Sequence, residues 1–449
     1  MRTLLVLSLL AALAVAGCGN GSRAVEPTPV VVDTDMGPDD VLALLYLVSR
    51  PDLDVRAVAV SGTGLVRCPA GAQQAVKLLA AAGRAEIPVA CGRDRPLAGF
   101  NAFPPEWRNP ADAFFGIPLP PTAARPDRRG AVALLDDAIS SSPRAVELVA
   151  LGPLTDVAEL LRAHPSAAQR LAGIRTMAGA VDAPGNIGKG HEGAEYNLWV
   201  DPVAADEVLR SEVPVTVVPL DATNAVPATV FFALGLQRFH YGTAPAALAW
   251  ALVDATRMHA GGSYFWDPLA AAALAAPAVV RFRDERLRAT RDGRLVRDAS
   301  RRAVRVAVGA DRERFERELL GTLAGRARVA IPPARSGAAI TCEDGGCAYR
   351  GPTEVQVAGE GAFDTVNRSG VEMTHILGRL HEGHDAADLR RLVRRDRPFT
   401  PPVWFSRGAE GTTPPHSRMT WLVTAEPGDH AIVVTGPGGT QVLAGIRAN

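Results

Sequence analysis

Four carboxylates lie within eight positions near the start of the chain, in Asp33-Thr34-Asp35-Met36-Gly37-Pro38-Asp39-Asp40. The apolar run from Val30 to Val32 precedes them, as expected of a strand that is buried on both faces. Asp33 and Asp35 share one side of the strand end, and Asp39 and Asp40 fall in the first turn of a helix, where the helix dipole favours anions. Four close carboxylates repel each other, and a hard divalent cation with oxygen ligands usually relieves this repulsion. Helix capping explains one or two of these residues but not four, so the motif predicts a metal site.

The elements that must position this motif alternate between strand-like and helical patterns. The expected strands are 29–35, 55–61, 87–90, 145–151, 174–179 and 215–220, and the expected helices are 73–82, 129–140, 154–163, 202–209 and 246–259. This alternation predicts an α/β fold with a mostly parallel, Rossmann-like sheet flanked by helices. Ligands of such sheets bind at the carboxyl ends of the strands, which is where the aspartates lie.

Further motifs follow the aspartates in a fixed order. They are Leu151-Gly152-Pro153-Leu154-Thr155-Asp156, Gly185-Asn186, Glu195-Tyr196-Asn197-Leu198-Trp199-Val200-Asp201-Pro202, Leu220-Asp221-Ala222-Thr223-Asn224 and Trp266-Asp267-Pro268-Leu269. Together with the first motif they resemble the signature of the inosine-uridine-preferring nucleoside hydrolase family, over about residues 29–330. The resemblance implies the nucleoside hydrolase fold and an N-glycosidase that releases ribose and a base.

The resemblance also implies roles for individual residues. It implies a calcium ion held by Asp35, Asp40, Asp267 and the backbone carbonyl of Thr155. Asp35 would then accept the proton of the water that attacks the sugar. Asp33 would support the metal ligands from behind. The implied substrate-binding residues are Asp39 and Asn197 at the 2′- and 3′-hydroxyls, and Asn186, Glu195 and Met177 at the 5′-hydroxyl end. Taken singly, Asp267 could equally cap a helix and Asn197 could close a turn.

Two positions depart from the family pattern. Trp266 stands where many relatives with purine substrates have a histidine that protonates the leaving base. Tryptophan cannot donate a catalytic proton but can stack on a base, so Trp266 is a substrate-binding candidate. His259 and His191 are the alternative proton donors, although each also fits a surface histidine. Thr63 stands near the position where relatives often have an asparagine that touches the sugar.

The first seventeen residues have the features of a bacterial signal peptide. Arg2 precedes an apolar stretch from Leu4 to Ala16 that is too short to span a bilayer. Val15-Ala16-Gly17-Cys18 resembles the lipobox of lipoproteins, in which the cysteine is lipidated. We therefore expect residues 1–17 to be removed, residues 18–28 to form a linker, and Cys18 to anchor an exported protein to the cell envelope.

The remaining cysteines indicate which disulfides can form, and the balance of charges indicates which partners the protein can attract. Cys342 and Cys347 can close a small loop, and Cys68 and Cys91 form either a second disulfide or two separate buried thiols. Lys plus Arg and Asp plus Glu number 48 each, so no global field attracts nucleic acid, and a small neutral substrate fits better. The arginine-rich segment 281–302 contains interleaved acids and predicts a hairpin with a solvated face.

The pattern changes after Pro332-Pro333. We expect a nucleoside hydrolase-like domain over 29–333 and a small β domain over 334–449, with short strands near 355–357, 421–423, 430–434 and 442–444. Segments 363–370 and 427–430 resemble a cupredoxin-type β-sandwich, over about one hundred residues. No cysteine follows Cys347, so a copper site is not expected, and the histidines there fit surface or structural roles.

Three functions fit the sequence to different extents. The first is an exported, calcium-dependent hydrolase of ribonucleosides or related N-ribosyl compounds. The second is a surface lipoprotein that binds nucleoside or ribose with weak or no turnover. The third is a phosphatase of the haloacid dehalogenase type, which also begins with Asp-Thr-Asp, but Gly37 does not fit its motif. The sequence leaves the base specificity and a homo-oligomer open.

Overall fold

The computed structural model describes residues 26–240, 242–326, 338–355, 361–381, 383–397, 399–423 and 428–448. The expected signal peptide, Cys18, most of the expected linker 18–28 and Pro332-Pro333 lie outside these residues. No helix within the described ranges is long and apolar enough to cross a membrane.

A nine-stranded sheet forms the centre of the N-terminal part, with the order β3-β2-β1-β4-β5-β6-β9-β7-β8. Neighbouring strands from β3 to β9 in this order run parallel, and β7 and β8 add an antiparallel edge. The predicted α/β fold is therefore confirmed. The strands are β1 (Thr28–Thr34), β2 (Leu53–Val60), β3 (Val89–Cys91), β4 (Val146–Ala150), β5 (Leu171–Thr176), β6 (Val215–Val217), β7 (Val280–Ala289), β8 (Leu295–Arg297) and β9 (Ala303–Ala310).

Helices cover both faces of this sheet, so its strands are buried on both sides. Val30 and Val32 of β1 pack into one core with α1, α2 and α10 to α13, and Val31 packs into a second core with α4, α5 and α8. The helices are α1 (Pro38–Ser49), α2 (Ala70–Ala81), α3 (Pro105–Asp112), α4 (Ala131–Ser140), α5 (Thr155–Ala163), α6 (Pro165–Ala168), α7 (Tyr196–Val200), α8 (Pro202–Arg210), α9 (Leu220–Thr223), α10 (Val230–Phe239), α11 (Ala244–Thr256), α12 (Trp266–Ala275) and α13 (Arg312–Leu323), with short 3₁₀ turns η1 (Phe114–Gly116), η2 (Met258–Ala260) and η3 (Pro277–Val279).

The predicted helices and strands are present, and the structure differs from the prediction at one helix end and in one hairpin. The helix expected over 246–259 ends at Thr256, because Arg257 adopts a left-handed conformation with φ 51° before η2 begins. The hairpin expected in 281–302 forms from β7 and β8, and β9 adds a third strand to it. Its arginines pair with acids such as Glu285 and Asp298.

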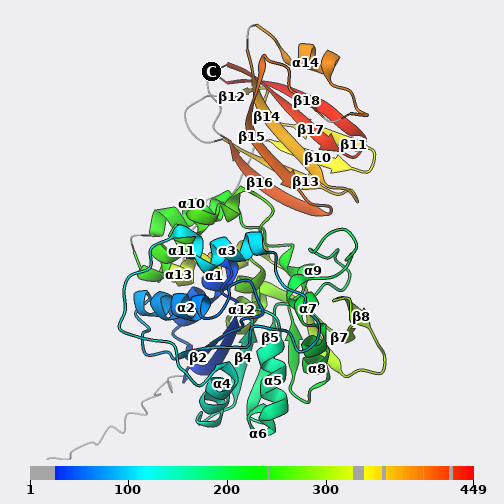
Figure 1. Ribbon diagram of the computed structural model, residues 1–449. Coiled ribbons are helices and arrows are strands. Elements are labelled where there is room, and N and C mark those ends of the chain that lie inside the picture. Colours follow the sequence, from blue (N-terminus) through cyan, green and yellow to red (C-terminus); the bar gives the residue numbers. More distant parts are fainter. Residues whose placement is uncertain are drawn as a thin grey trace, which may run out of the picture.

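Two further sheets form an all-β region at the C-terminal end (Figure 1). The first has the order β11-β10-β13-β16 and the second β12-β18-β17-β14-β15. Buried side chains from both sheets share one core, as in a sandwich, and α14 (Ala386–Leu392) packs on the outer face of the second sheet. The strands are β10 (Ala339–Glu343), β11 (Gly346–Arg350), β12 (Glu354–Val355), β13 (Gly361–Asn367), β14 (Met373–Leu380), β15 (Phe405–Thr413), β16 (Ser417–Val423), β17 (Gly428–Gly436) and β18 (Gly439–Ala448).

The short strands expected in this region are therefore present within the described residues, whereas Gln356, Val357 and Pro427 lie outside them. The cupredoxin resemblance itself stays a prediction. The region touches the N-terminal part where β16 contacts α10, and the Tyr264 hydroxyl shares a hydrogen bond with Ser417. His375 is fully buried, so its predicted structural role fits its position.

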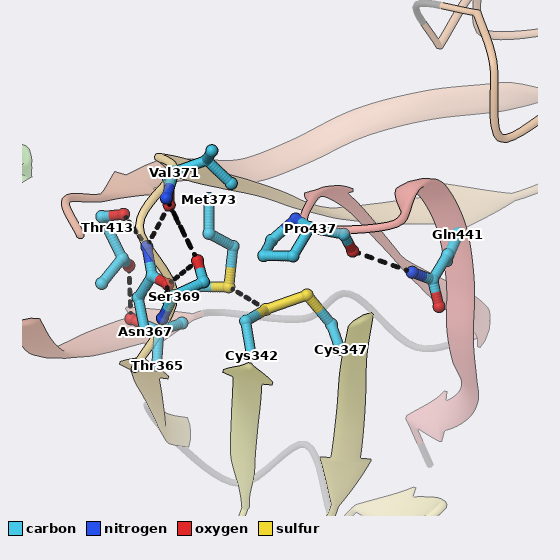
Figure 2. The surroundings of a disulfide bond; sticks show 10 residues. All are labelled: Cys342, Cys347, Thr365, Asn367, Ser369, Val371, Met373, Thr413, Pro437 and Gln441. Carbon is cyan, nitrogen blue, oxygen red and sulfur yellow. Dashed lines mark hydrogen bonds between the residues drawn. A yellow bond between two sulfur atoms is a disulfide. The ribbon is translucent and has the colours of Figure 1, made fainter. Parts of the chain in front are cut away.

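Both expected disulfides are present, so the alternative of two separate thiols at Cys68 and Cys91 is wrong. Cys68–Cys91 links the loop after β2 to the end of β3, with Cα atoms 5.8 Å apart. Cys342–Cys347 joins two directly paired residues of β10 and β11, with Cα atoms 4.0 Å apart. Figure 2 shows this second disulfide beside Met373, next to the hydrogen bonds of Asn367 and Ser369.

Candidate active site

A cleft of about 720 Å³ opens at the carboxyl ends of β1, β4 and β5. Its lining includes most of the site residues expected from the sequence: Asp35, Asp39, Asp40, Met177, Asn186, Glu195, Asn197, Trp266 and Asp267. These residues come from strand ends and from the first turns of α1, α7 and α12. Parallel strands bring such ends to one edge of a sheet, so residues far apart in sequence meet there.

The backbone around Asp35 is unusually tight. Met36 has a left-handed conformation with φ 59°, which turns the chain sharply between Asp35 and the start of α1. A Cβ atom at Gly64 would lie 2.0 Å from the Asp35 Cβ, and one at Gly152 would lie 2.8 Å from it. The backbone amide of Leu65 donates to Asp35 Oδ2 at 3.1 Å. The carboxylate is therefore held in one place by its neighbours.

Asp39, Asp40 and Asp267 form a compact acidic group. One carboxylate oxygen from each lies within 4.8 Å of the others. The Thr34 hydroxyl and the Asp35 amide donate to Oδ1 of Asp40, at 2.6 Å and 2.9 Å. The Asp267 amide donates to Asp39 Oδ2 at 3.5 Å. These bonds leave carboxylate oxygens of all three residues available to a cation.

Burial and mutual repulsion make the ionised form of this group costly. Burial raises the pKa of Asp39 to about 7, with a further contribution from Asp40. Burial, followed by Asp39 and Asp40, raises the pKa of Asp267 well above its usual value, and burial followed by Asp40 does the same for the pKa of Asp35. Among the described residues, Asp267 Oδ1 is buried without a hydrogen-bond partner. A group of carboxylates that repel each other, with one buried oxygen that lacks a donor, fits a hard divalent cation.

Two expected ligands differ from the structure. Asp35 lines the cleft, but Asp39 takes its place in the compact group. Thr155 is not in the cleft lining, and its hydroxyl instead donates to Asp201 at 2.8 Å. Because Thr155 is the first residue of α5, its carbonyl points along the helix axis toward the other end of the helix. The metal-binding role expected of this carbonyl stays a prediction, while Leu151, directly after β4, lines the cleft and accepts from the Asn197 side-chain amide.

The residues expected at the sugar are held by backbone groups. The Asn197 amide nitrogen donates to the carbonyls of Leu151, at 2.7 Å, and Met177, at 3.0 Å, which leaves its own carbonyl oxygen to a ligand. Glu195 caps α7 and accepts from the amides of Gly179, Asn197 and Leu198. Asn186 accepts from the Tyr196 amide at 3.1 Å. Burial raises the pKa of Glu195.

Two expected supporting residues lie outside the cleft lining. Asp33 is fully buried, and neither of its carboxylate oxygens has a partner within the described part of the chain. Burial raises its pKa well above the usual range, and Asp156 and Asp40 add to this effect. The Thr63 hydroxyl bonds to Ser61, at 2.9 Å, and to Thr155, at 3.2 Å. Asp33 thus faces the acidic group from the interior, whereas Thr63 has no contact with the cleft.

Aromatic side chains form another part of the cleft lining. Phe103, Trp107, Tyr196 and Trp266 are among them. Tyr196 stacks on Phe103 and packs against Trp107, with ring centroids 5.0 Å apart in both pairs. Tyr264 lies behind Trp266, 5.6 Å away, and burial raises its pKa to about 12. A flat heteroaromatic ring fits this part of the cleft.

The sequence did not single out Phe103, Trp107 or Tyr196 as site residues. Tyr196 lies between two expected residues, which is the one signal that could have found it. The two histidines considered as proton donors are elsewhere: His191 is exposed and packs against Trp199, and the ring of His259 lies 3.3 Å from the Val253 carbonyl. Neither histidine lines the cleft.

Comparisons with known proteins agree with this geometry. The family described as inosine-uridine preferring nucleoside hydrolase matches residues 30–317. An uncharacterised protein of Schizosaccharomyces pombe is 31% identical over 222 residues, which cover 49% of this chain and 70% of that protein. The pyrimidine-specific ribonucleoside hydrolase RihA of Citrobacter koseri is 34% identical over 196 residues, which cover 44% of this chain and 61% of its own length.

Solved structures match a larger part of the fold. A plant nucleoside hydrolase superimposes with a TM-score of 0.60 and 26% identity, covering 66% of this chain and 99% of the plant chain. An inosine-guanosine nucleoside hydrolase gives a TM-score of 0.57 and 25% identity, covering 68% of this chain and all of the other.

Proposed function

The chain belongs to the inosine-uridine preferring nucleoside hydrolase family, and we propose that it is an exported, calcium-dependent enzyme that hydrolyses the N-glycosidic bond of ribonucleosides or related N-ribosyl compounds. One observation carries the proposal. The fold gathers eight residues that the family pattern assigns to metal and ribose into one cleft at the carboxyl ends of its strands.

The acidic end of the cleft fits a bound calcium ion. Asp40 and Asp267 would hold it through carboxylate oxygens, of which Asp267 Oδ1 lacks a hydrogen-bond partner among the described residues, with Asp35 and Asp39 beside them. When bound, such an ion lowers the pKa of a coordinated water molecule. Residues of the protein accept the proton of this water molecule and bind the ribose and the base.

Asp35 is the proposed base that accepts the proton of the attacking water. Its carboxylate borders the cleft and is fixed by the Leu65 amide and by the packing of Gly64 and Gly152. A base fixed at one point removes the need to order it during the reaction. Asp33, buried near the end of β1 two residues before Asp35, stabilises the arrangement of the acidic group from the interior.

The ribose would lie between the acidic group and α7. Asp39 and Asn197 bind its 2′- and 3′-hydroxyls, and Asn186, Glu195 and Met177 border its 5′-hydroxyl. Positive charge develops on the sugar as the bond to the base breaks, and the nearby carboxylates and the Asn197 carbonyl oxygen stabilise that charge. The base would stack on Trp266.

Export and lipid anchoring complete the proposal. The N-terminal sequence supports a signal peptide followed by lipidation at Cys18. The two disulfides support an oxidising compartment outside the cytoplasm. Globomycin treatment of cells that express the full chain tests the anchor, because it blocks processing of lipidated precursors. A mature protein of unchanged size would contradict lipidation at Cys18.

The central test is ribose release from a panel of purine and pyrimidine nucleosides, with calcium and with a chelator. We expect release with calcium only, and none from the Asp35→Ala variant. Calorimetric binding of the same nucleosides without any ribose release would instead support the binding lipoprotein. Full activity in chelator would overturn the calcium mechanism.

A further inference from the structure

When the N-glycosidic bond of a nucleoside breaks, its electron pair stays on the base nitrogen. A base that was neutral in the nucleoside then needs a proton from a general acid. The cleft lining within the described residues contains five carboxylates and no lysine, arginine or histidine. His191 and His259 lie away from it. The protein therefore offers no cationic acid where the leaving base would lie.

Apart from the carboxyl groups, which the proposed function assigns to the metal, the attacking water and the ribose, hydroxyl groups are the remaining donors at the cleft, and none suits this task. Thr256 and Ser263 carry aliphatic hydroxyls, which are very weak acids. Tyr196 has a phenol, but burial followed by the charge of Glu106 raises its pKa, so it releases its proton less readily. Its ring is also stacked on Phe103, with 16° between the planes. Stacking on a base is the role that this geometry favours.

The charge and the walls of the cleft both favour a cationic ligand. The five carboxyl groups of the lining outnumber the two charges of a divalent ion, and no cationic side chain among the lining residues opposes a cationic ligand. Trp266, Trp107, Tyr196 and Phe103 are aromatic residues of the same lining. Aromatic faces, above all those of tryptophan, attract cations.

Building on the proposed function, we propose that the preferred substrates are N-ribosides whose heteroaromatic base already carries a positive charge, such as a quaternised pyridine or an N-alkylated purine. The bond between C1′ and the base nitrogen breaks, and its electron pair neutralises the charge on the base. The water oxygen bonds to C1′, and the proton of the water passes to Asp35. No proton has to reach the leaving base.

The matched substrates guanosine and 7-methylguanosine test this proposal, because they differ by one methyl group and one positive charge. A missing general acid costs about a hundredfold or more in rate, so we expect kcat/KM for 7-methylguanosine to exceed that for guanosine by about this factor. Equal values would overturn the inference and leave the proposed function intact. Release of ribose from neither substrate, with calcium present, would overturn both.

Replacing Trp266 tests whether this residue sets the preference. Trp266→His places an ionisable donor in the cleft wall, so we expect faster guanosine hydrolysis and a preference reduced about tenfold. Trp404→Phe is the matched control, since Trp404 stacks on His384 in the C-terminal region, with centroids 4.0 Å apart. An unchanged preference in Trp266→His would overturn the role of Trp266.

Trp107→Leu tests the recognition of the cation by the aromatic walls. The probes are nicotinamide riboside, which carries a positive charge, and 4-nitrophenyl riboside, whose leaving group needs no proton but is uncharged. We expect KM to rise about tenfold for the charged probe and much less for the uncharged one. An equal rise for both would overturn the part of the proposal that concerns charge.

Discussion

The nine-stranded sheet and the C-terminal β-sandwich satisfy their buried polar groups differently. In the cleft lining, Oδ1 of Asp267 is buried without a hydrogen-bond partner among the described residues, and the same holds for carboxylate oxygens of Asp33 and Asp156 outside the lining. In the sandwich, the hydroxyls of Thr365 and Thr413 bond to each other at 2.6 Å, and the Asp364 carboxylate pairs with Arg418.

This difference separates a region built for chemistry from one built for stability. An unpaired buried polar group costs free energy, so a fold retains several together only where something else completes them. A cation and a substrate can do so at the cleft. The sandwich has its partners within the protein, and we expect it to tolerate changes that abolish hydrolysis. Four experiments can break or sharpen this comparison.

The largest effect is expected from Asp267→Asn. Removing a ligand charge should lower ribose release at least about a thousandfold. It should also raise the unfolding temperature of metal-free protein, because repulsion among the carboxylates falls. Asp364→Asn is the matched change in the sandwich: it should lower the stability of that region and leave hydrolysis within about twofold. Activity assays and calorimetry check both, and a destabilised metal-free Asp267→Asn would contradict the comparison.

A smaller effect is expected from added methyl groups at two crowded glycines. A Cβ at Gly64 would lie 2.0 Å from the Asp35 Cβ, and one at Gly378 would lie 2.0 Å from the Phe405 ring. Gly64→Ala should displace Asp35 and lower kcat about a hundredfold. Gly378→Ala should cost about 1–3 kcal/mol of stability without changing kcat. Similar kinetic effects of the two variants would show that the regions are not independent.

The two regions should also respond to pH in opposite directions. Burial raises the pKa of Glu316, on α13, to about 7, so the folded state binds the extra proton and loses stability as pH rises from about 4.5 to 7. Burial lowers the pKa of His375, on β14, to about 3, so the sandwich loses stability as pH falls below about 6.5. Each unit of difference between the folded and unfolded pKa changes the free energy of unfolding by about 1.4 kcal/mol at most. Calorimetry between these limits should resolve transitions that shift oppositely, and parallel shifts would refute this expectation. Glu316→Gln should remove the pH dependence of stability in the N-terminal region only.

The smallest effect is expected from the disulfides. The cysteines of Cys68–Cys91 are 23 residues apart and those of Cys342–Cys347 are 5 apart. A longer closed loop constrains the unfolded chain more, so loss of Cys68–Cys91 should lower the stability of the protein by about 1 kcal/mol more than loss of Cys342–Cys347. The first also anchors the loop whose Leu65 amide bonds to Asp35, so Cys68→Ser with Cys91→Ser should lower kcat severalfold. The pair Cys342→Ser with Cys347→Ser should leave kcat unchanged. Equal kinetic effects would argue against a role for the loop in positioning Asp35.

Much of the fold was predictable because its signals are local. The apolar run Val30 to Val32 predicted a buried strand, and Gly37-Pro38 followed by two acids predicted the start of α1. Both depend on residues within a few positions. The left-handed turn at Met36 was not predictable, since methionine rarely adopts it and only the packing around Asp35 holds it there.

The candidate site was predictable as a set of residues but not as a geometry. By itself the sequence determined that carboxylates and amides end successive strands, because period, turn residues and helix starts are encoded locally. Only the tertiary structure decided that Asp39 joins Asp40 and Asp267 in the compact acidic group, that Leu151 lines the cleft and Thr155 does not, and that Trp107 and Tyr196 line the same cleft as Trp266. These outcomes depend on how distant segments pack, and no local pattern encodes the distances between them.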